Sequence, residues 1–288
     1  MQAHYSSLTR LSAHGFITFL DYNNREMEIT LIIPILLGWA GGLFINYIAD
    51  VLPYTRKLTQ PTCPHCQTPF SWADYLTLHR CRSCGQRRSL RTGLVHLLTV
   101  ASFVYLWLFP RIGLGLPLSL ILLIYFGIVI VIDIEHRLIL HTTSLFGALL
   151  GLIIGIYTQS KLNGLSAAIF TSLLGGVAGF VFMFLIYKGG ELVARYRARK
   201  MRAAGLEEDD EEAFGSADVI LTSILGLMLG WPNIILGLFT SAIIGGVIAL
   251  LAVIQTFVKR RRAPDTLMTF IPYGPALVLG AFYILYFF

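Results

Sequence analysis

The sequence carries little charge for its length. Only 13% of its 288 residues are Asp, Glu, Lys or Arg, and 56% are hydrophobic. Soluble domains usually carry about 25% charged residues, so the composition excludes an ordinary soluble domain. The apolar runs also lack the alternation of polar and apolar residues, over about ten positions, that membrane barrel strands show. The sequence therefore predicts an all-α polytopic membrane protein embedded in the lipid bilayer.

Long uncharged runs supply the helices that this class requires. A helix needs about 20 apolar residues to cross a bilayer, and about eight runs approach that length. These predicted transmembrane helices cover residues 29–52, 93–110, 114–132, 139–158, 164–187, 218–231, 233–257 and 267–288. Residues 1–28 lack the basic, apolar and cleavage-site order of a signal peptide, and we expect them to form an external N-terminal tail.

Lys and Arg are concentrated in alternate loops along the chain and are nearly absent from the loops between them. Eighteen of the 22 Lys and Arg residues lie in the segments 53–92, 188–216 and 258–265 or at Arg137. The positive-inside rule places these segments in the cytoplasm and both termini outside. Topology thus explains the net charge of +6, and the sequence predicts no nucleic-acid partner.

Cysteine is equally scarce, and all four cysteines lie in the predicted cytoplasmic loop 53–92. Cys63 and Cys66 form one C-x2-C pair, and Cys81 and Cys84 form a second. Four thiolates at this spacing can close a tetrahedral zinc site, and the cytosol keeps thiols reduced. The pattern therefore favours zinc over two disulfides or free thiols. Because four cysteines fill the coordination shell, we expect a structural zinc that stabilises a loop too small to fold alone.

Carboxylates are rare in the apolar runs, where an ionised Asp costs about 2.5–3.5 kcal/mol at the bilayer centre. Three Asp residues lie in or beside a run: Asp50, Asp133 and Asp218. We interpret Asp50 as a boundary residue that reaches water. Asp133 and Asp218 lie at the same predicted depth, so packed helices would bring them together as an acid–base pair acting on a water. A second interpretation, in which each Asp only caps a helix end, stays open at this point.

Several motifs resemble one family in their number, order and spacing. Besides the two cysteine pairs, they are "GGLFINYIADVLP" (41–53), "SLRTGLVHLLT" (89–99), "DIEHRLILH" (133–141) and "GSADVIL" (215–221). Over about residues 29–288, the chain resembles the prepilin peptidases. These are integral-membrane aspartyl proteases that process type IV prepilins and related pseudopilins.

The resemblance implies a peptidase domain over 93–288 with Asp133 and Asp218 as the catalytic pair. It implies that the zinc ligands are Cys63, Cys66, Cys81 and Cys84. It further implies prepilin or pseudopilin substrates, cleavage at the cytoplasmic face and residence in the prokaryotic cytoplasmic (inner) membrane. Many family members with the cysteine loop also methylate the new N-terminus, using S-adenosylmethionine.

The sequence departs from the family pattern at several positions. Leu140 replaces a Pro, Ala217 replaces the second Gly of the GxGD motif, Ile220 replaces a Lys and His96 replaces a Glu. If the position of Ala217 required a positive φ, the change would cost about 1 kcal/mol or more. His96 leaves the methyltransferase activity open. The departures also keep an alternative function open, a non-catalytic relative that acts as a prepilin-binding or assembly scaffold.

Overall fold

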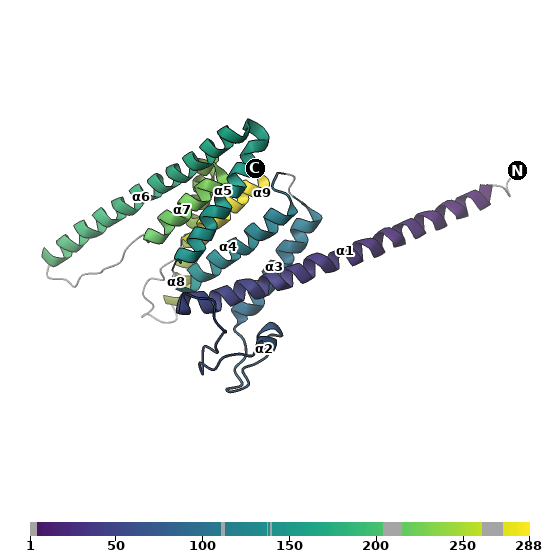
Figure 1. Cartoon of the computed structure of the whole chain (residues 1–288), viewed down its shortest axis with the longest axis horizontal. Helices are drawn as coiled ribbons and strands as arrows, with labels where there is room; N and C mark the ends of the chain where they lie inside the picture. The colour runs from purple at the N-terminus through teal and green to yellow at the C-terminus, as the bar shows by residue number, and fades with distance from the viewer. Residues whose placement is uncertain (1–4, 111–112, 137, 139, 204–214, 261–272) are drawn as a thin grey trace.

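The computed structural model describes residues 5–110, 113–136, 138, 140–203, 215–260 and 273–288, and most of these residues are helical (Figure 1). The helices are α1 (Tyr5–Thr55), α2 (Trp72–Leu76), α3 (Leu90–Leu108), α4 (Leu116–His136), α5 (His141–Asn163), α6 (Leu165–Ala203), α7 (Ser216–Leu229), α8 (Asn233–Arg260) and α9 (Gly274–Phe287). Within the described ranges, sheet-like pairing is limited to an isolated bridge between Thr62 and Pro69. The predicted all-α class is confirmed.

Each predicted membrane helix has a counterpart in the structure. Among the described residues, six helices are long and apolar enough to cross a bilayer: the Thr30–Thr55 part of α1, α3, α4, α5, α6 and α8. The other two, α7 and α9, have 14 residues each, which is about 21 Å of helix. Six of the expected eight spans therefore reach full length, and two are shorter apolar helices.

The first helix is longer than the predicted span. α1 runs from Tyr5 to Thr55, so the predicted tail and the first span belong to one helix, and no helix end marks the boundary at residue 29. The predicted cytoplasmic segments 188–216 and 258–265 fall partly outside the described residues.

Two apolar cores meet at α4. One core joins α4 to α5, α7 and α9 through residues such as Leu122 and Leu221. The other joins α4 to α1 and α3 through residues such as Ile45 and Ile132. α4 is therefore the helix that connects the N-terminal pair of helices to the rest of the bundle.

Glycines allow α6 and α7 to approach each other closely. A Cβ atom added to Gly175 would overlap the carbonyl oxygen of Gly226, and a Cβ added to Gly226 would overlap that of Gly175. Small residues at helix interfaces permit this approach in membranes. The contact fixes the position of α7, whose first turn carries Asp218.

We predict that Gly226→Ala destabilises the protein by about 1–3 kcal/mol, because the added methyl group overpacks the α6–α7 interface. Gly246→Ala is the matched control, since an added Cβ there meets no atom within 4 Å and alanine favours a helix by up to about 1 kcal/mol. Thermal unfolding of both variants in detergent checks this. Equal melting temperatures would contradict the close contact.

Candidate functional site

Asp133 and Asp218 come together at one end of the bundle. Asp133 lies in the last turn of α4, and Asp218 lies in the first turn of α7. The two residues are 5% and 8% exposed, and their carboxyl groups interact electrostatically. Two carboxyls in a site of low dielectric resist joint ionisation and can share one proton. The arrangement can therefore supply an acid and a base at the same place.

The start of α9 closes this site from a third side. A Cβ atom added to Gly274 would overlap the Oδ2 atom of Asp133, so the backbone of α9 lies directly against that carboxyl group. The preceding residue, Tyr273, interacts electrostatically with Asp218. Sequence reasoning did not single out Gly274 or Tyr273 as site residues. The available signal was that both lie in the stretch "IPYGPALVLGAF" (271–282), which the motifs named above do not include.

The departures around the two aspartates fit the structure without strain. Ala217 lies within α7, and it is not among the non-glycine residues with positive φ, so the cost considered for this position does not arise. Leu140 precedes α5, is 2% exposed and belongs to the core that α4 shares with α1 and α3. Ile220, on α7, is 40% exposed.

The four cysteines also come together. Their sulfur atoms all lie within 4.8 Å of one another. The Sγ atoms of Cys63 and Cys84 are 3.7 Å apart, and those of Cys66 and Cys81 are 3.5 Å apart. Zn–S bonds of about 2.3 Å in a tetrahedron give a sulfur–sulfur separation of about 3.8 Å. All four are free cysteines, so the spacing matches a metal cage and not a pair of disulfides.

The chemistry of these thiols fits a divalent cation. Hydrogen bonds with Thr68 lower the pKa of Cys66 to about 6. A backbone hydrogen bond from Gln86 lowers the pKa of Cys84, but partial desolvation and the neighbouring thiols outweigh it and raise that pKa to about 12. The neighbouring thiols therefore oppose one another's ionisation, whereas a bound metal ion deprotonates its thiol ligands. The cluster suits structural zinc, which would join the two halves of the cysteine loop (residues 56–89).

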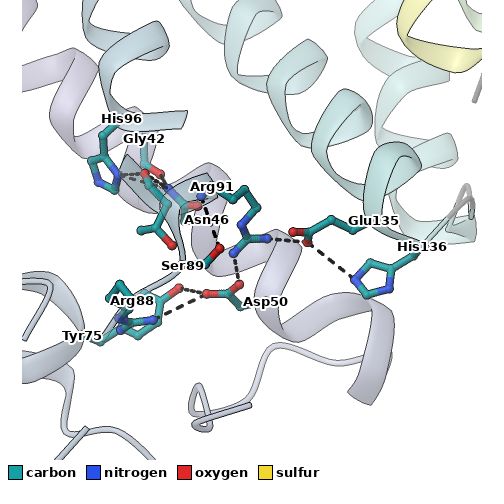
Figure 2. A network of polar contacts seen from close by, with 11 residues as sticks. Gly42, Asn46, Asp50, Tyr75, Arg88, Ser89, Arg91, His96, Glu135 and His136 are labelled. Carbon is teal, nitrogen blue, oxygen red and sulfur yellow. Dashed lines mark hydrogen bonds and ion pairs between the residues drawn. The ribbon is translucent and has the colours of Figure 1, made fainter. Parts of the chain in front are cut away.

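Asp50 has a different environment from the one we inferred from sequence. Its side chain is only 23% exposed, and it pairs with protein groups instead of standing in water (Figure 2). Oδ1 accepts a hydrogen bond from Arg91, and Oδ2 accepts one of 2.7 Å from Tyr75. Burial and the Asp50 carboxylate raise the pKa of Tyr75, so the phenol remains a donor. Sequence spacing gave no sign of these long-range pairs.

Arg91 extends the network to α4. Its Nη1 atom donates a 2.6 Å hydrogen bond to Oε2 of Glu135, and Nε2 of His136 lies 3.9 Å from the same oxygen. A cavity of about 770 Å³ opens beside these groups, between the cysteine loop and the ends of α1, α3 and α4. Its wall includes Asp50, Arg87, Arg88, Arg91, Glu135 and His136.

His96 lies away from this cavity, between α1 and α3. It is 4% exposed, its Nδ1 atom is 3.1 Å from Nδ2 of Asn46, and its ring contacts that of Trp39 at a centroid distance of 4.7 Å. The described residues that form the cavity wall include Thr92, one turn earlier on α3, but not His96.

Comparisons with known proteins place these sites in context. The type IV leader peptidase family model matches residues 120–250, and the model of the bacterial peptidase A24 N-terminal domain matches residues 36–109. The first match contains both aspartates, and the second contains all four cysteines. No solved structure gave a significant match.

Several curated relatives are similar over most of the chain. A prepilin leader peptidase/N-methyltransferase of Pectobacterium carotovorum is 27% identical over 76% of this chain and 71% of the relative. A protein of the same name in Myxococcus xanthus is 25% identical over 76% of this chain and 62% of its own length. A type 4 prepilin-like proteins leader peptide-processing enzyme of Escherichia coli is 29% identical over 80% of this chain and 76% of the relative.

We predict that the purified protein holds about one zinc ion per chain and that Cys63→Ser removes most of it, because the buried thiolate is lost. The control is His65→Ala, which keeps all four thiols of the cluster. Metal analysis by mass spectrometry gives the content of each variant. Full zinc content in Cys63→Ser, or none in the unmodified protein, would overturn the cage.

Proposed function

We propose, because this chain belongs to the type IV leader peptidase family, that it is a membrane aspartyl endopeptidase that removes leader peptides from type IV prepilins or pseudopilins. The observation that carries the proposal is the electrostatic interaction between Asp133 and Asp218, both buried and on separate helices. The names of the relatives support prepilins as substrates.

In the proposed mechanism, the two carboxyl groups share one proton and hold the attacking water between them. The ionised carboxylate takes a proton from this water, which attacks the scissile carbonyl carbon. The protonated carboxyl then gives its proton to the leaving amide nitrogen as the C–N bond breaks. Two acidic groups with opposite protonation states are sufficient for both steps.

We place the reaction at the cytoplasmic face of the inner membrane. The two aspartates lie at the end of the bundle that also carries the cysteine loop, because Arg91 at the start of α3 pairs with Glu135, two residues after Asp133. Positive charge assigns this end to the cytoplasm. A prepilin could then enter with its apolar stem in the membrane and its leader in the cytoplasm.

A second activity, methylation of the new N-terminus with S-adenosylmethionine, is supported by the names of the relatives and by the cavity under the cysteine loop. Its volume of about 770 Å³ is in the range of small-molecule and cofactor sites. Arg87 and Arg88 in its wall are suited to the carboxylate of the methyl donor. The donor would supply an electrophilic methyl group, and the residues of this chain would bind and orient it.

Asp133→Asn and Asp218→Asn should each reduce leader cleavage by at least about a thousandfold, because neither variant can cycle a proton between two carboxyls. The test is co-expression with candidate prepilins from the same cell, followed by mass measurement of the mature N-terminus. That mass also reports methylation, as an increase of one methyl group. Protein levels in the membrane should stay normal, since Asn is nearly isosteric with Asp.

If the unmodified protein is present in the membrane and cleaves none of the prepilins of its own cell, the peptidase proposal fails. In that case the scaffold alternative is favoured, and prepilin binding without cleavage would support it.

Gly274→Ala should lower the cleavage rate by about tenfold or more, because the new methyl group displaces the Asp133 carboxyl and a small misplacement is enough for such a loss. Gly246→Ala again serves as the control with free space around the new methyl group. Rates measured at equal amounts of folded protein decide the matter. An unchanged rate in Gly274→Ala would show that α9 does not constrain Asp133.

A further inference from the structure

We propose that Arg91 is a positioning residue that couples the cysteine loop to the α4 end carrying Asp133. The inference rests on the proposed peptidase function, because it assigns the loop a part in cleavage. Arg91 lies in the first turn of α3, and its backbone N–H donates to the Ser89 side chain that caps this helix, at 3.3 Å. The helix and its cap together fix the backbone position from which the Arg91 side chain extends.

The guanidinium group of Arg91 joins two other helices. Nη2 donates to Asp50 on α1, and Nη1 donates to Glu135 on α4 at 2.6 Å. The Arg91 side chain is 19% exposed, so water screens these pairs less than it screens surface ion pairs. A planar fork of N–H donors can serve two carboxylates at once, which a lysine ammonium does less rigidly.

The cysteine loop holds the other side of Asp50. Tyr75, which follows the first cysteine pair, donates to Oδ2 of Asp50 at 2.7 Å. Arg88 lies 3.7 Å from the same oxygen, and its guanidinium carbon is 4.1 Å from the centre of the Tyr75 ring. Tyr75 in turn packs in one buried cluster with Cys63 and Cys81. The buried cluster that contains the cysteines therefore includes a direct partner of Asp50, and Figure 2 shows Tyr75 and Arg88 beside the Asp50 carboxylate.

The link from the cysteine loop through Asp50 and Arg91 to Glu135, called the relay below, ends next to the candidate catalytic pair. Glu135 and Asp133 lie in the same last turn of α4. Asp218 is carried by α7, which packs on α5 and α6, and α4 and α7 both pack on α9. A shift of the α4 end would therefore move Asp133 relative to Asp218. The bridge from Arg91 to Glu135 opposes such a shift.

The test compares Arg91→Met, Arg91→Lys and Glu135→Gln with unmodified protein in lipid nanodiscs. Three quantities are measured: kcat and KM for leader cleavage, zinc per chain, and hydrogen–deuterium exchange of residues 128–136. Arg195→Gln, which breaks an ion pair with Glu191 on the exposed part of α6, is the control for loss of an arginine.

We expect Arg91→Met and Glu135→Gln to lower kcat by about 10- to 100-fold, the scale expected for a misplaced catalytic group, with KM little changed. Both should increase exchange at the α4 end and keep their zinc. Arg91→Lys should recover part of kcat. The Arg91→Met/Glu135→Gln double variant should be no slower than either single variant, because both changes break one link. Arg195→Gln should match the unmodified protein.

A Glu135→Gln variant with normal kcat and normal exchange overturns the relay. Because this variant leaves the cysteine loop unchanged, it still tests the proposal if Arg91→Met fails to accumulate. Additive losses in the double variant overturn it as well. If unmodified protein does not cleave prepilins, the proposed function fails separately. Exchange at residues 128–136 then decides the relay alone, because faster exchange in Glu135→Gln supports it and unchanged exchange contradicts it.

Discussion

Repulsion between two buried carboxyl groups is the constraint on which this structure depends. Asp133 and Asp218 interact at one end of an apolar bundle, where the dielectric is low and the energy of two like charges is large. In the proposed mechanism, one shared proton relieves the repulsion, and the same proton makes one group an acid and the other a base. The rest of the fold must hold the groups close against their tendency to separate.

Helix packing provides that restraint from several directions. Gly175 and Gly226 let α6 and α7 meet closely, which fixes Asp218. The start of α9 lies against Asp133 at Gly274, where any side chain would collide with the carboxyl. Arg91 links the last turn of α4 to Asp50 on α1, and Tyr75 of the cysteine loop donates to the same Asp50. The two matched family models thus correspond to parts that meet at α4.

Sequence periodicity and spacing predicted the elements well, and contacts between elements poorly. The apolar runs indicated the helices because a bilayer imposes a length on them. The C-x2-C pairs indicated a metal cage because the spacing is local. The role of Asp50 was not predictable, since its partners Tyr75 and Arg91 are 25 and 41 residues away. Gly274 was missed as a site residue for the same reason, because only the fold brings it to Asp133.

The proposed mechanism requires the side chains at positions 133 and 218 to meet in the membrane. The most direct measurement introduces Asp133→Cys and Asp218→Cys together and treats intact membranes with the shortest bifunctional thiol reagents. Mass spectrometry then identifies the linked peptides. The account predicts a link between the two introduced thiols. If each thiol reacts singly with a maleimide but no such link forms, the two positions do not meet and the account is contradicted.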